Sequence, residues 1–322
     1  MSKPKILCTR RFPPNIVDRL SRDYQPILNQ DDTQLTAEQI VARAAGCDGI
    51  FCCNTERFDA ALISALPESV KILATLSVGF EHIDLPAAAS RNITVTNTPD
   101  VLTEATADAA MLCLLGAARR AAEGDRLVRE GGWKRWTTEL LLGVHVSGKR
   151  LGILGMGRIG RAVAERARGF GMRIHYHNRR PLDESIAGPA TYYADPVAML
   201  SQCDFLSINA PSTPETRGFL NAERIAKLPD RAIVVNTARG DIIDDEALIA
   251  ALKSGKIAAA GLDVFAGEPN IHPEYAGLMN TLLLPHLGSA THETRDAMGF
   301  MCLDNFDAFF AGASCPNAIQ IA

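Results

Sequence analysis

Short apolar runs alternate with stretches of helical periodicity along the N-terminal part of the chain. Apolar runs of strand length lie at 6–8, 49–53, 72–75 and 93–95. Apolar residues recur at helical spacing over 15–22, 37–45 and 59–66. Short strands separated by helices of this length are typical of βαβ units, so we expect a parallel sheet covered by helices.

A second series of the same kind begins near residue 150. Its apolar segments lie at 151–154, 173–177, 205–208, 232–235, 259–262 and 281–284. Helical patterns lie between most of these segments, so the sequence predicts a second doubly wound parallel sheet. The polar stretch before this series contains both tryptophans, Trp133 and Trp136.

Two longer helices flank the second series. The first is predicted over 102–120, where Thr103 is placed to cap the helix. The apolar run within it, 109–118, is 10 residues long and well short of the ~20 that cross a bilayer. The second helix is predicted over 291–311 and is not paired with a strand, so we expect it to return to the first series.

The balance of charge and the cysteines narrow the class of protein. The 322 residues include 33 Lys and Arg against 37 Asp and Glu, a net charge of -4, which argues against nucleic-acid binding. The length favours two domains. The 8 cysteines contain no CxxC pair, and the apolar stretch near the N-terminus is too short for a signal peptide. We therefore expect a cytoplasmic protein with reduced cysteines and no membrane partner, most often an enzyme.

A glycine-rich turn opens the second series. Residues 151–160 form a predicted buried strand followed by Gly-x-Gly-x-x-Gly, with an apolar-periodic helix over 162–170. Gly155 permits the tight turn, Gly157 lets a pyrophosphate approach backbone N–H groups, and Gly160 allows close packing of helix on strand. The positive end of the helix favours an anion. The turn predicts a dinucleotide site, with a purely structural turn as the alternative.

The end of the next strand bears on which dinucleotide binds. An acidic residue here hydrogen-bonds the ribose of NAD, but this chain has Asn178, followed by Arg179 and Arg180. Two guanidinium groups without a carboxylate suit a 2′-phosphate, so we expect NADP(H) in preference to NAD(H), with a solvated corner as the alternative. His175 and His177 share a strand face, but nothing nearby completes a ligand set, so no metal site is expected.

Three charged residues follow later strands of the second series: Arg239, Glu268 and His286. Each alone has an ordinary explanation as a solvated or partly buried side chain, yet ligands of such sheets bind beyond the carboxyl ends of strands. If a bound dinucleotide transfers a hydride to a carbonyl group, an acid must protonate the alkoxide that forms, and a histidine suits this role near neutral pH. A nearby carboxylate would favour the imidazolium, and a guanidinium can hold a carboxylate of a ligand.

At these residues the chain resembles the D-isomer-specific 2-hydroxyacid dehydrogenase family, and most closely its glyoxylate/hydroxypyruvate reductases. The resemblance covers essentially the whole chain, with motifs at 77–84, 97–103, 151–160, 236–240, 262–269 and 285–291. It implies an α/β protein of two doubly wound parallel-sheet domains with the active site in the cleft between them. A flavodoxin-like substrate domain would comprise 1–99 and 291–322, and an NADP-binding Rossmann domain 100–290.

The resemblance also implies roles for individual residues. Arg239, Glu268 and His286 would be catalytic, and Val78 and Gly79 would bind the substrate together with Arg239 and His286. The expected cofactor-binding residues are Thr103, Gly155, Gly157, Arg158, Ile159, Gly160, Asn178, Arg179, Arg180, Ala210, Pro211, Thr237, Ala238, Asp263 and Gly288. Among these, Asp263 would bind the nicotinamide carboxamide and Arg158 the pyrophosphate. Relatives dimerise through an arm at the position of Trp133 and Trp136, so a homodimer is expected.

The expected activity is NADPH-dependent reduction of glyoxylate or hydroxypyruvate to a D-2-hydroxy acid, with the proton from His286. The NAD preference of well-known family members is not carried over, because they have an acidic residue in place of Asn178. One alternative is reduction of a larger keto acid, 2-ketogluconate or phenylpyruvate. A more remote one is a nucleotide sensor without enzymatic activity, similar to the corepressors that share this fold.

Overall fold

The computed structural model describes residues 3–320, and the chain divides into two compact units. The first unit runs to Leu102 and resumes at Ala290, and the second is Thr103–Ser289. We describe each unit by itself. The assignment of substrate binding to residues 1–99 and 291–322, and of cofactor binding to 100–290, stays a prediction.

The first unit contains a five-stranded parallel sheet in the order β2-β1-β3-β4-β5. Its strands are β1 (Lys5–Cys8), β2 (Gln25–Ile27), β3 (Gly49–Cys52), β4 (Ile72–Thr75) and β5 (Thr94–Thr96). This is the strand order of flavodoxin-like folds, as predicted. The apolar pattern missed β2, which has three residues and includes Gln25 and Pro26.

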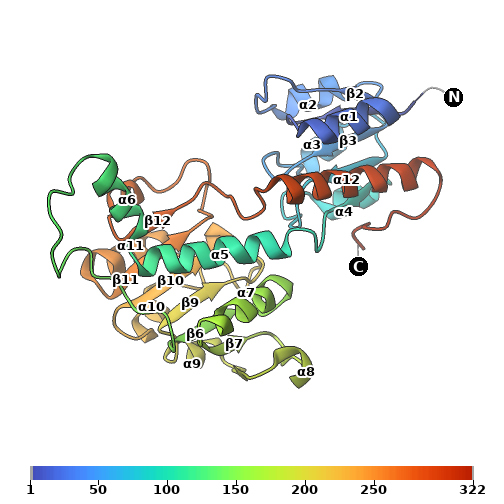
Figure 1. Ribbon diagram of the computed structural model, residues 1–322. Helices are drawn as coiled ribbons and strands as arrows, with labels where there is room; N and C mark the ends of the chain where they lie inside the picture. The colour runs from blue at the N-terminus through green and yellow to red at the C-terminus, as the bar shows by residue number, and fades with distance from the viewer. Residues whose placement is uncertain (1–2, 321–322) are drawn as a thin grey trace. The chain divides into compact units, whose positions relative to one another are not determined.

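Helices cover both faces of this sheet and create two apolar cores. They are α1 (Pro14–Asp23), α2 (Ala37–Arg43), α3 (Ala60–Ala65), α4 (Leu85–Ser90) and α12 (His292–Phe310). The closing helix α12 contacts β4 and α1, beside which it lies in Figure 1. A Cβ atom at Gly299 would lie 2.0 Å from Cδ1 of Ile16, so α1 and α12 depend on that glycine for their close approach.

The second unit contains a seven-stranded parallel sheet in the order β12-β11-β10-β9-β6-β7-β8. Its strands are β6 (Arg150–Leu154), β7 (Arg173–His177), β8 (Ala190–Tyr192), β9 (Phe205–Ile208), β10 (Ala232–Asn236), β11 (Ile257–Leu262) and β12 (Thr281–Leu283). The strand order is that of a Rossmann fold with one further strand, and it reverses between β6 and β9. The sequence pattern missed the three-residue strand β8.

Two cores lie on the faces of the second sheet. The helices are α5 (Thr103–Ala118), α6 (Ala121–Arg129), α7 (Arg158–Gly169), α8 (Glu184–Ala187), α9 (Pro196–Leu200), α10 (Ala222–Lys227) and α11 (Asp245–Ser254), with 3-10 turns η1 (Gly240–Ile242) and η2 (Pro273–Gly277). Helices α5 and α7 lie side by side (Figure 1). Arg166 bridges them by contacting both Glu104 and Asp108 at 2.7 Å.

The predicted helix 102–120 differs from the structure at both ends. Thr103 is the first residue of α5 rather than a residue before it. At the other end Arg120 adopts a left-handed conformation with φ of 53°, which ends one helix and begins α6. The sequence reasoning did not predict α6, because its residues were assigned to a polar connection.

Two further features of the fold are the state of its cysteines and the apolar character of its helices. All 8 cysteines are unpaired thiols, and six of them are buried. Over residues 3–320, no helix combines the length and the apolar character that crossing a membrane requires.

Candidate active site

The candidate site lies at the carboxyl edge of the second sheet. Parallel strands end at the same edge, so the loops after β6, β7, β9, β10, β11 and β12 share one side of the unit. The glycine turn follows β6 directly beside the point where the strand order reverses. This is the position at which open α/β sheets bind ligands.

Each glycine of the turn has the geometry expected of it. Gly155 has φ of 90°, and a Cβ there would lie 2.7 Å from the backbone of Ala210. A Cβ on Gly160 would lie 2.3 Å from the carbonyl oxygen of Gly155, so this glycine brings α7 against the turn. Gly157 differs, because its Cβ would have nothing within 4 Å. The described chain therefore leaves room beside the backbone of Gly157.

The start of α7 leaves backbone donors for a ligand. Gly157 precedes the helix, and no side chain caps it. The first N–H groups of a helix have no partner within the helix, and its positive end favours anions. Arg158 and Ile159 are the first two residues of α7, so the predicted pyrophosphate contacts fall on this helix end.

Asn178 has a structural role that the sequence reasoning did not predict. Its Oδ1 accepts a hydrogen bond from the backbone N–H of Met156 at 2.6 Å, inside the glycine turn. The following Arg179 and Arg180 are exposed and make no hydrogen bond or ion pair within the described chain. The Thr213 hydroxyl, followed by the Glu215 backbone N–H and the charge of Arg179, lowers the pKa of the exposed Glu215 carboxyl.

Some buried polar atoms at this edge have no hydrogen-bond partner among the described residues. They include Oδ1 of Asn209, directly after β9, and Oγ1 of Thr237, directly after β10. Buried polar groups are nearly always hydrogen-bonded, so unsatisfied ones at a ligand-binding edge indicate a missing ligand or water. Together with the open side of Gly157 and the uncapped α7, these atoms fit a dinucleotide. Asn209 was not among the predicted residues.

His286 and Glu268 form the centre of the predicted catalytic cluster. Nδ1 of His286 lies 2.5 Å from Oε1 of Glu268, and 34% of each side chain is exposed. The second carboxylate oxygen of Glu268 accepts the backbone N–H of Phe265 at 3.2 Å. Nε2 of His286 has no hydrogen-bond partner within residues 3–320, so the atom opposite the carboxylate is available to a ligand.

The backbone around His286 is held by Asp263. The N–H of His286 donates to the carbonyl oxygen of Asp263 at 2.8 Å, and the buried Asp263 carboxylate accepts the N–H groups of Leu287 at 2.6 Å and Gly288 at 2.8 Å. His286 has φ of 56°, a conformation that non-glycine residues adopt only when their surroundings enforce it. Thr106 of α5 adds a hydrogen bond to the carbonyl oxygen of Gly288 at 3.1 Å.

The pKa values of the two carboxyl groups, Glu268 and Asp263, are shifted in opposite directions. Burial acts to raise the pKa of Glu268, but the hydrogen bond and charge of His286, the N–H of Phe265 and the charge of Arg239 together hold it below its usual value. Burial raises the pKa of Asp263, although the two backbone donors oppose the rise. Glu268 is therefore the carboxylate kept ionised beside the histidine.

Arg239 joins this cluster through the packing of two loops. A Cβ at Gly240 would lie 1.9 Å from the backbone carbon of Phe265, so the loops after β10 and β11 touch. Half-buried Arg239 donates from Nη1 to the carbonyl oxygen of Ala238 at 2.7 Å. The structure thus brings together all three predicted catalytic residues in the second unit.

The loop after β9 carries two of the predicted cofactor-binding residues. Ala210 is buried against Gly155, while exposed Pro211 accepts the Thr216 hydroxyl at 2.6 Å. The neighbouring Ser212 hydroxyl donates to Asp241 at 2.7 Å, a contact that ties the β9 loop to η1.

Val78 and Gly79 lie in the first unit, in the loop after β4. Their carbonyl oxygens are engaged, since Asn97 donates to Val78 at 2.8 Å and the Ser77 hydroxyl donates to Gly79 at 2.7 Å. Neither the Val78 nor the Gly79 N–H donates to a protein group in the part of the chain that the structure describes. The loop is therefore fixed with two backbone donors left over.

The two histidines of β7 have protein partners. Nδ1 of His175 contacts the Tyr193 hydroxyl at 3.1 Å, and Nδ1 of His177 contacts the Tyr193 carbonyl oxygen at 2.9 Å. Within residues 3–320, no three His, Cys, Asp or Glu side chains are grouped as a metal site requires.

Comparisons with known proteins decide the family. The family model for the D-isomer specific 2-hydroxyacid dehydrogenase NAD binding domain matches residues 111–288. A glycerate dehydrogenase from Hyphomicrobium methylovorum is 44% identical, over 99% of this chain and 100% of that protein. This chain belongs to the D-isomer specific 2-hydroxyacid dehydrogenase family. It is therefore an enzyme of this family, and residues 111–288 are its NAD-binding region.

Other family members extend over the same length. A glyoxylate reductase from Thermococcus onnurineus is 41% identical, over 99% of this chain and 96% of that protein. An NADPH-dependent glyoxylate/hydroxypyruvate reductase from Sinorhizobium meliloti, crystallised with NADP and malonate, superposes with a TM-score of 0.89. It is 34% identical, over 99% of this chain and 97% of that one. Both sheets of this dehydrogenase thus have counterparts in solved family members.

Proposed function

We propose that this dehydrogenase reduces small 2-keto acids, hydroxypyruvate and glyoxylate, to D-2-hydroxy acids with NADPH. The observation that carries the proposal is the His286–Glu268 pair at 2.5 Å, with the charge of Arg239 acting on Glu268, at the edge that bears the glycine turn. The relatives support the choice of substrate. Glycerate, which the name of the Hyphomicrobium methylovorum relative gives as its substrate, is the 2-hydroxy acid that reduction of hydroxypyruvate yields.

His286 is the proton donor in this proposal. As the carbonyl oxygen of the substrate gains negative charge, Nε2–H of the imidazolium donates its proton to that oxygen. Glu268 accepts the hydrogen bond from Nδ1–H and stabilises the positive charge that His286 carries before transfer. The Asp263 contacts with the backbone of residues 286–288 hold the ring on its loop.

Arg239 and the β4 loop bind the substrate carboxylate in this proposal. The guanidinium of Arg239 offers a planar fork that matches a carboxylate, and its charge polarises the adjacent keto group. The spare N–H groups of Val78 and Gly79 offer a second set of donors on the first unit. Binding by backbone N–H groups requires a loop held in place, which Asn97 and Ser77 provide.

The cofactor would be held along the carboxyl edge of the second sheet. Gly157, Arg158 and Ile159 would bind the pyrophosphate, Asn209 and Thr237 would satisfy their buried oxygens on the ligand, and Asp263 would meet the carboxamide. When bound, the reduced nicotinamide supplies the hydride that the reaction requires. The exposed, unpaired Arg179 and Arg180 support a preference for the 2′-phosphate of NADPH.

A homodimer forms part of the same proposal. Trp133 and Trp136 are 53% and 73% exposed, and Leu142 is 65% exposed on the same connection. Aromatic residues are enriched at protein interfaces, so such exposure supports an interface at this segment. Sedimentation of the purified chain would test it, since a monomer at micromolar concentration is not expected.

The decisive experiment is a substrate panel with purified enzyme. Oxidation of NADPH and NADH is followed with glyoxylate, hydroxypyruvate, 2-ketogluconate and phenylpyruvate. We expect the highest kcat/KM for hydroxypyruvate or glyoxylate with NADPH. A higher value for 2-ketogluconate or phenylpyruvate would favour the larger-substrate alternative. No turnover with any of the four would contradict the proposed activity.

A further inference from the structure

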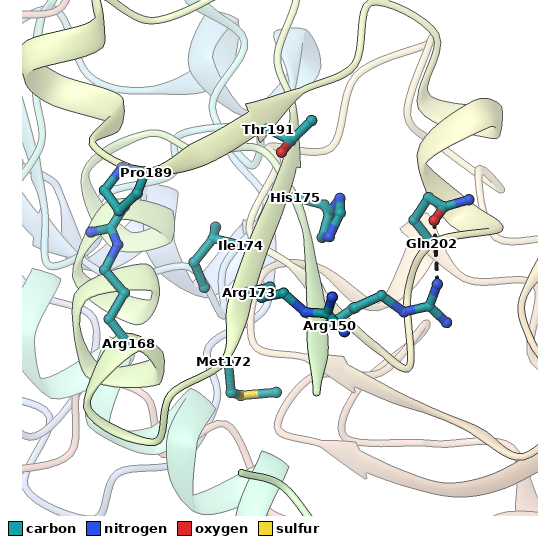
Figure 2. A pocket seen from close by; sticks show the side chains of 9 residues that line it. All are labelled: Arg150, Arg168, Met172, Arg173, Ile174, His175, Pro189, Thr191 and Gln202. Carbon is teal, nitrogen blue, oxygen red and sulfur yellow. Dashed lines mark hydrogen bonds between the residues drawn. The ribbon is translucent and has the colours of Figure 1, made fainter. Parts of the chain in front are cut away.

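A pocket separate from the candidate active site lies at the amino ends of β6 and β7 (Figure 2). Its volume is about 600 Å³, and its polar lining residues are Arg150, Arg168, Arg173, His175, Thr191 and Gln202. The glycine turn follows the carboxyl end of β6, so the pocket and the turn lie at opposite edges of the same sheet. None of the proposed catalytic or cofactor-binding residues lines this pocket.

One of its arginines is held in a fixed orientation. Asp204 accepts from Nη2 of Arg150 at 2.7 Å and from Nε at 3.1 Å, and Oε1 of Gln202 accepts from Nη1 at 3.2 Å. Figure 2 shows the contact with Gln202 beside His175 and Arg173. A guanidinium held from two sides loses little rotamer freedom when it binds an anion.

The other two arginines make the pocket positive. Arg173 is exposed, and its side chain makes no hydrogen bond or ion pair in the described residues. Arg168, which lies beside Pro189 in Figure 2, donates from Nη2 to the carbonyl oxygen of Ala187 at 2.6 Å, and its buried Nε has no hydrogen-bond partner within residues 3–320. Asp204 is the acidic group that opposes these charges at Arg150. The positive charge of the arginines that line the pocket therefore exceeds the negative charge of Asp204.

His175 responds to this local charge. It lies on β7, where it contacts the Tyr193 hydroxyl. Burial lowers its pKa, the charges of Arg150 and then Arg173 lower it further, and Asp204 acts in the opposite direction. An anion bound between the two arginines would reduce their effect on the imidazole.

We propose that this pocket binds a small organic phosphate, with its phosphate group between Arg150 and Arg173. A phosphate offers several oxygens to two guanidinium groups at once, which a point-like anion does not. The volume exceeds what a free ion needs and lies within the ~300–1,000 Å³ of small-molecule sites. Thr191 and Gln202 supply uncharged polar groups for the rest of the molecule.

The titration of His175 measured by NMR tests this proposal without reference to activity. The ring signals of the 7 histidines are recorded against pH, and His175→Gln identifies the signal of His175. Glycerol 3-phosphate is the probe, and sodium chloride at equal ionic strength is the control. We expect the phosphate ester to raise the midpoint of His175 by about half a pH unit or more, and chloride to leave it unchanged.

Two matched variants locate the effect. Arg173→Gln removes an exposed side chain of the pocket and should abolish the response to glycerol 3-phosphate. The double variant Arg179→Gln/Arg180→Gln removes two arginines at the other end of β7 and should keep the response. An unchanged midpoint in the parent protein, a response that survives Arg173→Gln, or one lost in the double variant would each overturn the proposal. The cofactor site can fail its own tests without affecting this result.

Discussion

The side-chain oxygen of Asn178 accepts a hydrogen bond from the backbone N–H of Met156 at 2.6 Å. The Asn178 amide also donates to the Met156 carbonyl oxygen at 3.4 Å. The residue at the end of β7 thus stabilises the glycine turn that follows β6. A carboxylate at this position could keep the first hydrogen bond while it adds a negative charge next to Arg179.

Asn178→Asp should change cofactor preference without disturbing the turn. The aspartate can still accept a hydrogen bond from the backbone N–H of Met156. Its negative charge repels a 2′-phosphate, and its carboxylate oxygens can accept hydrogen bonds from ribose hydroxyls. We expect the ratio of kcat/KM for NADPH to that for NADH to fall at least about tenfold, or about 1.4 kcal/mol. Asn178→Ala, which removes the contact with Met156, is the control and should weaken both cofactors. An unchanged ratio in Asn178→Asp would contradict the proposed NADPH selectivity.

His286→Ala should separate chemistry from cofactor binding. Loss of the proton donor should lower kcat by about 10²–10⁴-fold. The affinity for NADPH, measured by quenching of tryptophan fluorescence, should stay within about twofold because the ring is not part of the glycine turn. A variant that retains full activity would remove His286 from its role as acid.

Glu268→Gln should change the dependence of activity on pH. The amide still accepts from Phe265, but it no longer stabilises a positive charge on His286. We expect kcat for keto-acid reduction to fall about tenfold or more, and the alkaline limb of the pH profile to move to lower pH. A pH profile that superposes on that of the parent enzyme would argue against the proposed role of Glu268 beside His286.

The same substitution should alter acid stability. Because the pKa of Glu268 is lowered in the folded state, its contribution is present above the unfolded value near 4.3 and is lost as pH falls through the folded value. Thermal unfolding monitored from pH 6 to pH 3 should show a shallower fall in Tm for Glu268→Gln than for the parent. Parallel curves would contradict this linkage.

Two glycines of the turn provide a matched pair for stability and binding. A Cβ at Gly160 would lie 2.3 Å from the carbonyl oxygen of Gly155, so Gly160→Ala should lower Tm by several degrees. Gly157→Ala meets nothing within 4 Å and should leave Tm unchanged, while NADPH affinity falls because the Cβ enters the open side of the turn. Equal stability of the two variants would contradict the packing argument.

Much of the fold could be predicted from the sequence because predominantly apolar, buried runs form the central strands of both sheets. The strands missed, β2 and β8, are short and lie at the sheet edges, where few side chains need to be buried. The division between α5 and α6 was also missed. It depends on the left-handed conformation of Arg120, a residue that gives no local signal of a break.

The candidate site also has features that the sequence predicts and features that it does not. Glycine has a specific conformational signature, so the roles of Gly155 and Gly160 could be read from their spacing. The contact of Asn178 with Met156 could not, because it joins two loops that meet only once β6 and β7 pair. The same is true of Asp263, whose carboxylate holds the loop of His286 although sequence reasoning assigned it to the cofactor alone.

The return of α12 to the first unit determines the order in which the two units can fold during synthesis. The second unit, Thr103–Ser289, is continuous and has its whole core on the growing chain before α12 is made. The first unit must wait for residues 292–310, since Phe306 and Leu303 complete the core that Ile16 and Phe51 begin. On the ribosome, the apolar surface of the N-terminal strands and helices therefore stays uncovered until residues 292–310 have been translated.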